Sequence, residues 1–199
     1  PGTPVANAFY AMMDQYLVKL DAMGVTIALT ADHGMKAKHA PTGEPNVIYL
    51  EPLLGEAGLT DFRVILPITD PYVVHHGALG GFATIYLDND SDHARARAAF
   101  DGVPGIETVL TRNEACNVFG LPADRIGDLV VISTRDYVLG SAPEKHDLSG
   151  LKDPLRSHGG LSEQRVPFIV NRCLEACATG RRNFDIFSHT LNHALEGSS

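Results

Sequence analysis

The chain has 199 residues, of which 44% are hydrophobic and 20% charged, a composition typical of a folded globular protein. Its formal net charge of -8 disfavours nucleic acid and acidic membrane surfaces as partners, because like charges repel. No apolar run approaches the roughly 20 residues that cross a bilayer, and the 3 cysteines lack the spacing of a disulfide framework, which favours a cytoplasmic location.

The first predicted elements are a helix and a buried strand. Hydrophobic residues recur at helical spacing over 5–23, and a glycine follows where such a helix would end. The next run, 25–30 (VTIALT), is almost continuously apolar, which is typical of a strand buried on both faces of a parallel sheet. Asp32, His33 and Gly34 come directly after this run, at the carboxyl end of the strand, where open α/β sheets bind ligands.

The middle of the chain, 41–125, is predicted to be a smaller α+β cap unit inserted into the main sheet. Its strands are shorter and its glycine and proline content is higher than in the segments on either side. Residues 1–40 and 126–199 would then be the two parts of the main domain. Within the inserted unit we expect strands at 46–50, 62–69, 81–88 and 106–110, and helices at 91–100 and 111–118.

The last third of the chain returns to the pattern of buried strands. We expect strands of the main sheet at 127–133 and 165–170, and a short strand at 137–140. The predicted fold is therefore α/β, with a mostly parallel sheet covered by helices on both faces. A closing helix at 184–195 is expected to pack on the sheet through Phe184, Phe187, Thr190, Leu191 and Leu195.

Two glycine-containing loops carry the candidate metal ligands. Asp32 and His33 supply a carboxylate and an imidazole, both ordinary zinc ligands, although the tripeptide could equally be a turn in which Asp32 caps the next element. His158 lies in the second loop, 157–160 (SHGG), which precedes another predicted strand. Two such loops beside one sheet indicate one site. A two-metal site needs about six protein ligands, so three would be only part of one.

The order of these motifs resembles the alkaline phosphatase superfamily. TADHGM follows a buried strand, RIGDLVV comes much later, and SHGG precedes RVPFIV. The segments PGTPVANAFYAMMDQYLVKLDAMG and DPYVVHHGALGGFATIYLD resemble the phosphonoacetate hydrolase family in particular. The resemblance implies that Asp32 and His33 bind one zinc ion and that His158 binds a second. It also implies that the nucleophile, a threonine or serine, and further ligands precede Pro1, so that the chain is the carboxyl-terminal part of a longer enzyme.

By this resemblance the complete enzyme is a zinc-dependent hydrolase that cleaves the carbon–phosphorus bond of phosphonoacetate to give acetate and phosphate. Its partner would be a small anionic phosphonate, and no nucleic acid or membrane. Two alternatives stay open: another phosphodiesterase or phosphomutase of the superfamily, with the same metal loops, and a catalytically inactive fragment or binding module. No sequence feature fixes the oligomeric state, and a homodimer is left open.

Two further groups of histidines are not predicted to bind zinc. Asp185 and His189 would share one face of the closing helix, but they follow the last zinc loop instead of preceding the first. His75 and His76 are adjacent on an extended segment, where neighbouring side chains point in opposite directions. We expect all four to have other roles.

Charged residues near the two loops are predicted to be solvated. Lys36 and Lys38 follow the first loop and could face an anionic substrate, but exposure to water is the usual state of lysine. The charged segment 144–147 before the second loop is expected to be exposed in the same way. Neither group is therefore assigned to the site.

Overall fold

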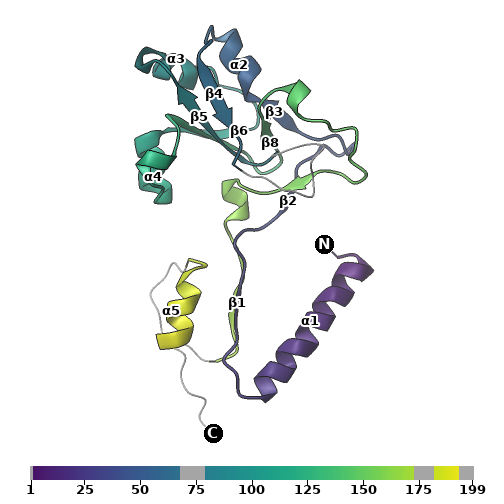
Figure 1. The fold of residues 1–199 in the computed structure, drawn as a ribbon. Coiled ribbons are helices and arrows are strands. Elements are labelled where there is room, and N and C mark those ends of the chain that lie inside the picture. The colour runs from purple at the N-terminus through teal and green to yellow at the C-terminus, as the bar shows by residue number, and fades with distance from the viewer. Residues whose placement is uncertain (1, 68–78, 173–181, 193–199) are drawn as a thin grey trace. The chain divides into compact units, whose positions relative to one another are not determined.

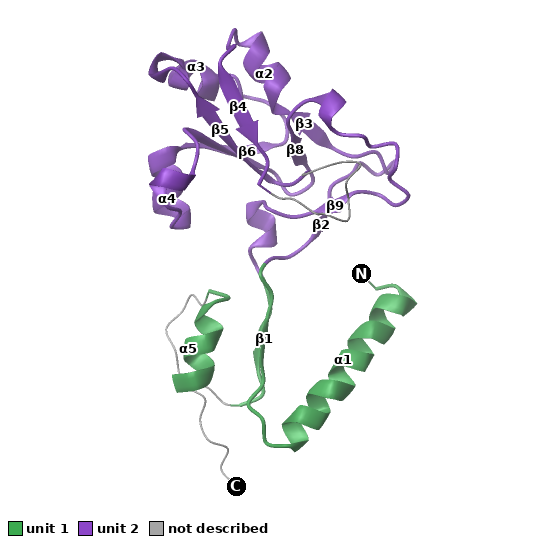
Figure 2. Ribbon diagram, in the orientation of Figure 1, with its two compact units in different colours: residues 1–32, 166–199 green, residues 33–165 purple. Residues whose placement is uncertain are grey.

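The structure is a computed structural model, and it describes residues 2–67, 79–172 and 182–192 (Figure 1). The chain divides into two compact units, which are described separately. Unit 1 consists of residues 1–32 and 166–199, and unit 2 consists of residues 33–165 (Figure 2). Both units combine helices with strands, so the predicted α/β class is confirmed.

Unit 2 is built on a four-stranded sheet in the order β4-β5-β7-β6, with every neighbouring pair antiparallel. Two shorter ladders accompany it: β3 pairs with β8 in parallel, and β2 pairs with β9 antiparallel. The strands are β2 (Lys36–Ala37), β3 (Val47–Tyr49), β4 (Phe62–Ile65), β5 (Phe82–Leu87), β6 (Ile106–Thr111), β7 (Leu129–Ser133), β8 (Val138–Gly140) and β9 (Arg156–Ser157). The helices are α2 (Leu50–Glu56), α3 (His93–Ala98) and α4 (Arg112–Phe119), with 3-10 turns at 90–92, 123–125, 143–145 and 161–163.

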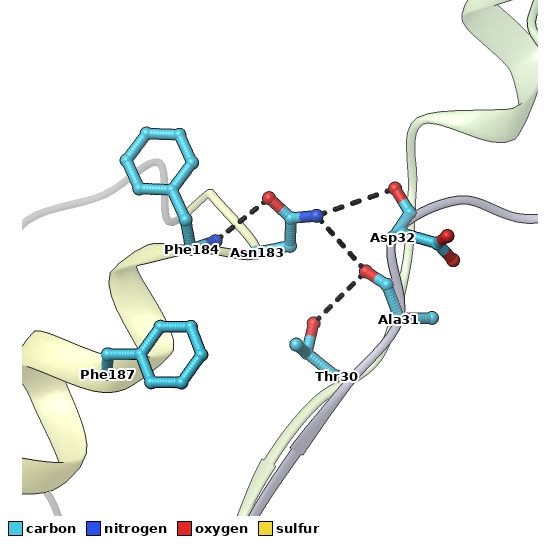
Figure 3. Close-up of a pocket in the computed structure, with 6 residues that line it drawn as sticks. All are labelled: Thr30, Ala31, Asp32, Asn183, Phe184 and Phe187. Carbon is cyan, nitrogen blue, oxygen red and sulfur yellow. Dashed lines mark hydrogen bonds between the residues drawn. The ribbon is translucent and has the colours of Figure 1, made fainter.

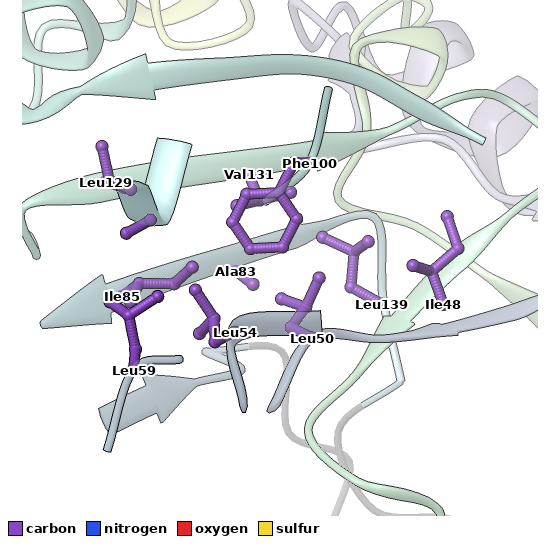
Figure 4. Close-up of a cluster of buried hydrophobic side chains, with 11 residues drawn as sticks. Ile48, Leu50, Leu54, Leu59, Ala83, Ile85, Phe100, Leu129, Val131 and Leu139 are labelled. Atoms are coloured by element: carbon purple, nitrogen blue, oxygen red, sulfur yellow. The ribbon is translucent and has the colours of Figure 1, made fainter. Parts of the chain in front are cut away.

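Helices cover both faces of this sheet. The larger core, shown in Figure 4, joins α2 and α3 to one face of the strands. A second cluster joins Ala115 of α4 to the opposite face. Strand β7 contributes to both, because its side chains alternate: Leu129 and Val131 lie in the first cluster, and Val130 and Ile132 in the second. All five residues of β7 are therefore buried.

The prediction of a mostly parallel sheet does not hold for the described strands. Among them only β3 and β8 run parallel, and β7, the strand expected in the main parallel sheet, lies between β5 and β6 with both pairings antiparallel. A continuous apolar run reports burial on both faces, and helices on both faces of an antiparallel sheet give the same pattern. The sequence pattern was therefore right about burial and wrong about strand direction.

Unit 1 contains two helices and one two-stranded ladder. Its elements are α1 (Pro4–Ala22), β1 (Ala28–Thr30), β10 (Phe168–Val170) and α5 (Asp185–Asn192). Helix α1 begins with Thr3, whose hydroxyl accepts a hydrogen bond from the Ala6 amide, and with Pro4 in the first turn, where proline costs no hydrogen bond. Strand β1 pairs antiparallel with β10, Leu29 opposite Ile169.

Burial in unit 1 differs from the sequence prediction. The run 25–30 was expected to be buried on both faces, but Leu29 is 40% exposed. In α5 the expected packing residues Phe184, Phe187 and Leu191 are exposed, and Ile186 is the buried one. Thr190 donates its hydroxyl to the Ile186 carbonyl within the helix, and Leu195 lies outside the described residues. The pattern found the helix but not the face that it buries.

The two units divide the chain at 32/33 and 165/166, whereas the domain boundaries predicted from the sequence, 40/41 and 125/126, stay predictions. Residues 126–165, expected in the main domain, share unit 2 with the segment 41–125 that was predicted to be an inserted cap. Strand β7 accounts for part of this, because it forms the centre of the sheet with β5 and β6. The assignment of core and cap stays a prediction.

Candidate metal centre

The imidazole rings of His33 and His158 stack on each other. Their centroids are 3.6 Å apart and their planes differ by 7°. Both residues belong to unit 2, although 124 other residues separate them in the sequence, and both side chains are half-buried. The structure thus brings together two of the three predicted metal ligands.

A hydrogen bond fixes the form of the His33 ring. Its Nδ1 lies 2.9 Å from the Gly34 carbonyl oxygen. A carbonyl oxygen can only accept, so Nδ1 carries the proton, and Nε2 is the nitrogen with the lone pair in the neutral ring. Histidines that bind metals usually donate their other ring nitrogen to a carbonyl or carboxylate in this way. His33 is therefore held in the form that a metal requires.

Short ladders hold the two histidine loops in place. Lys36 of β2 pairs with Ser157 of β9, which places the residues after His33 beside the residue before His158. On the other side of the second loop, the Gly81 amide donates to the His158 carbonyl over 2.7 Å. A Cβ at Gly81 would lie 2.5 Å from the Gly160 amide nitrogen, so only glycine permits this approach. The backbone on both sides of His158 is thus tied to unit 2.

Sequence reasoning missed a buried ion pair beside these loops. Lys38, predicted to be solvated, is completely buried, and its Nζ lies 3.3 Å from Oε1 of the equally buried Glu163. Burial lowers the pKa of Lys38, and the Glu163 carboxylate opposes that shift. Glu163 stands three residues after Gly160 and accepts its amide hydrogen bond over 2.9 Å. A glutamate three residues after the start of a turn was the available signal.

The segment 144–147, also predicted to be solvated, contains one buried residue. His146 accepts a hydrogen bond at Nε2 from the Ser141 amide over 3.0 Å. Lys145 is exposed as expected and forms an ion pair with Glu51 over 2.7 Å. Because Nε2 of His146 accepts from the backbone amide of Ser141, this histidine stabilises the local turn.

Asp32 belongs to unit 1 and is described there. Its backbone carbonyl, like that of Ala31, faces the Asn183 side-chain amide, at 3.4 Å and 3.3 Å respectively. These residues line a pocket of about 240 Å³ together with Phe184 and Phe187. Figure 3 shows the Asp32 carboxylate pointing away from the two phenylalanine rings. The Asp32 residue is exposed.

The His33 and His158 rings lie parallel at the candidate centre, with centroids 3.6 Å apart. Imidazole nitrogens are ordinary zinc ligands, so the pair offers two of the side chains that a zinc site requires. Among residues 2–67, 79–172 and 182–192 no group of three acidic, histidine or cysteine side chains is arranged to hold an ion. The roles of Asp32, His33 and His158 as ligands stay predictions.

The other histidines that the sequence singled out have local contacts or lie outside the description. Asp185 accepts a hydrogen bond from the Arg182 amide over 2.8 Å, and the His189 ring meets the edge of Phe168 with centroids 5.8 Å apart. His75 and His76 lie outside the described residues. Asp185 and His189 thus contribute to the packing of α5.

The chain is similar to solved structures over nearly its whole length, although no family model matches it. Two structures of phosphonoacetate hydrolase from Sinorhizobium meliloti 1021, in complex with phosphonoformate and with phosphonoacetate, share 53% identity and a TM-score of 0.90 with it. Each comparison covers 98% of this chain and 48% of the other. The chain therefore spans about half the length of these solved relatives.

Two other proteins extend the comparison. A phosphonoacetate hydrolase from Penicillium oxalicum is 63% identical over 41 residues, which is 19% of this chain and 57% of that protein. Murine ectonucleotide pyrophosphatase/phosphodiesterase 5 is 19% identical, with a TM-score of 0.56, over 98% of this chain and 50% of its own. At that identity the likeness shows a shared fold alone.

Proposed function

We propose that this chain, a relative of the phosphonoacetate hydrolases over nearly its whole length, contributes part of a two-zinc site that hydrolyses phosphonoacetate to acetate and phosphate. The observation that carries the proposal is the stacked pair His33 and His158, which joins two separate motifs of the superfamily at one place. A protein with 53% identity has been solved with phosphonoacetate bound, which supports the choice of substrate.

The residues of this chain would hold the metal ions. His33 offers Nε2, because its Nδ1 proton is committed to the Gly34 carbonyl. His158 offers a parallel ring 3.6 Å away, and Asp32 offers an exposed carboxylate next to His33 in the sequence. Bound zinc would lower the pKa of a nucleophilic hydroxyl and neutralise charge on the phosphoryl oxygens. These three side chains would thus orient the cations toward a small dianionic substrate in a chain of net charge -8.

Other parts of the proposed site are not among the residues that we assign. The motif pattern calls for a threonine or serine nucleophile and further zinc ligands, and we propose that sequence outside these 199 residues supplies them. The breaking carbon–phosphorus bond leaves its electron pair on the acetate carbon, which takes up a proton.

The cytoplasmic location suggested by the cysteines stays a prediction. The described residues contain no helix long and apolar enough to cross a membrane.

The test is His158→Ala in a protein that contains this chain together with the nucleophile and the remaining ligands. We expect loss of about one zinc equivalent per chain, measured by atomic emission, and loss of most phosphate release from phosphonoacetate. His93→Ala is the matched control, because His93 is a half-exposed histidine of the same unit on helix α3. Unchanged zinc content and unchanged rate in His158→Ala would refute the assignment.

The same assay separates the alternative activities. A phosphodiesterase or phosphomutase of the superfamily would act on a nitrophenyl ester or transfer the phosphoryl group, and would release little phosphate from phosphonoacetate. An inactive binding module would turn over neither substrate. We expect kcat/KM for phosphate release from phosphonoacetate to exceed kcat/KM for the nitrophenyl ester.

A further inference from the structure

The buried ion pair of Lys38 and Glu163 carries a large free-energy cost of desolvation. The side chains are 0% and 1% exposed, and the Lys38 Nζ also donates to the Arg135 carbonyl over 2.7 Å. Removing two charges from water costs several kcal/mol per ion, and apolar residues of similar volume often stabilise a fold as well or better. Stability alone therefore gives no reason for this pair at this position, and its contacts indicate what it does.

Glu163 bonds to both histidine loops at once. Its Oε2 accepts from the Gly160 amide over 2.9 Å, two residues after His158. Its backbone carbonyl accepts from the Gly34 amide over 2.7 Å, directly after His33. One residue thus holds the neighbours of both stacked rings.

Lys38 holds the carboxylate in that position. Its Nζ binds Oε1, which leaves Oε2 for the Gly160 amide, and the Ser162 hydroxyl also binds Oε1. The Lys38 backbone is fixed as well, because its amide donates to the Leu155 carbonyl over 2.9 Å, next to strand β9. The ammonium group therefore aims the carboxylate at the second histidine loop.

Both histidine loops approach Glu163 closely. A Cβ at Gly160 would lie 3.0 Å from Oε2 of Glu163, and a Cβ at Gly34 would lie 3.2 Å from the Glu163 carbonyl oxygen. Both distances are tighter than most Cβ contacts, so a larger residue at either position would push Glu163 by a few tenths of an ångström. Glu163 thus contacts the second loop through its side chain and the first loop through its backbone.

We propose that Glu163, held by Lys38, is a positioning residue that sets the stacking of His33 and His158 for metal binding. This inference rests on the proposed function of the same site. Neither residue touches the metal or the substrate in this proposal. They act through the Gly34 and Gly160 amides.

The test is Glu163→Gln in a protein that contains this chain together with the remaining zinc ligands, with Zn²⁺ alone as the probe. The amide keeps the size of the side chain, but it has one accepting oxygen for two groups of donors and presents its own NH₂ to one of them. We expect the affinity for Zn²⁺, followed by NMR signals of the His33 and His158 rings, to fall about tenfold, as is common when groups that orient metal ligands are changed. In spectra recorded without metal, the contacts between the His33 and His158 rings should be weaker in Glu163→Gln than in the wild type.

The matched control is Glu51→Gln, which breaks the exposed pair with Lys145 in the same unit. It should change neither the zinc affinity nor the ring contacts. A purely structural role for Glu163 predicts lower stability in urea with unchanged zinc affinity of the folded chain, and that result would overturn the inference. If Glu163→Gln does not fold, Glu163→Asp keeps the buried charge but withdraws it by one methylene, and an unchanged affinity there would be equally decisive.

Two failures can be told apart. If the wild-type protein, with the remaining ligands present, shows no zinc-dependent shift at either histidine, the proposed function is contradicted, and the metal-free ring contacts decide the inference. If the wild type responds to zinc and Glu163→Gln responds equally, with the same ring contacts, only the inference is wrong.

Discussion

Units 1 and 2 differ in how completely they bury their hydrophobic residues. Unit 2 has fully buried strands and two clusters that fill both faces of its sheet. Helix α1 of unit 1 has no buried residue, and α5 has one, Ile186. On α1 the exposed large hydrophobic residues are Val5, Phe9, Tyr10, Met12, Met13, Tyr16, Val18 and Leu20.

This difference in burial indicates which unit contributes most of the stability of the described structure. Burial of apolar area is the main favourable term in folding, at about 25 cal/mol per Å². Unit 2 gains this free energy by burying apolar side chains in its own core, whereas many apolar side chains of unit 1 are exposed. The histidine pair and its buried support lie in unit 2, so the candidate site depends on the better packed region.

Hydrogen exchange gives the largest contrast. We expect backbone amides in β5 and β7 to exchange more slowly than those in α1, by on the order of a hundredfold or more, because local opening costs little where few apolar contacts exist. Mass spectrometry of deuterium uptake measures both regions in one sample. Equal protection in α1 and β7 would break the comparison.

A pair of leucine substitutions tests the same difference in burial between the two units. Leu54→Ala removes a fully buried side chain from α2, and we expect it to cost about 2–5 kcal/mol of unfolding free energy. Leu191→Ala removes a side chain that is 82% exposed on α5, with an expected cost of less than about 0.5 kcal/mol. Urea denaturation measures both, and similar costs would show that α5 is packed in solution.

Two glycine substitutions compare the site with its surroundings inside unit 2. Gly81→Ala would bring a Cβ to 2.5 Å from the Gly160 amide nitrogen, and we expect it to cost about 1–3 kcal/mol. Gly55→Ala, on helix α2 with open space around it, should instead stabilise by about 0.5–1 kcal/mol. Thermal unfolding distinguishes the two signs. A neutral Gly81→Ala would mean that the His158 loop can move away.

The smallest expected effect concerns the start of α4. The Thr111 hydroxyl accepts from the Glu114 amide over 3.3 Å, and Thr111→Ala should cost about 1 kcal/mol while Thr111→Ser should not. Hydrogen bonds from the Thr111 backbone and hydroxyl hold the pKa of Glu114 below its ordinary 4.5. That contribution is present above pH 4.5 and is lost as the pH falls through the lower folded value. The difference between wild type and Thr111→Ala should therefore shrink in acid, and a constant difference would contradict the capping.

Patterns within one element predicted the structure well. The helix expected at 5–23 is observed as α1, and the strand expected at 81–88 is observed as β5. Two longer segments, PGTPVANAFYAMMDQYLVKLDAMG and DPYVVHHGALGGFATIYLD, predicted the relationship to phosphonoacetate hydrolase, which the comparisons confirm. Hydrophobic spacing and motif residues are properties of short segments, so the sequence displays them directly.

Properties that depend on distant segments were predicted poorly. The direction of β7 depends on β5 and β6, and the buried face of α5 is set by Ile186 instead of the larger Phe187. The burial of Lys38 depends on Glu163, which lies 125 positions away. The identity of a residue does not state which partner surrounds it, and lysine is exposed in most proteins.

The most direct test of the candidate site is a zinc titration, followed by nitrogen NMR of the histidine rings, of a protein that contains this chain together with the remaining ligands. We expect Nε2 of His33 and one ring nitrogen of His158 to shift together, while His93 and His146 do not shift. Shifts at His33 without His158, or at neither, would contradict a shared metal centre at the stacked pair.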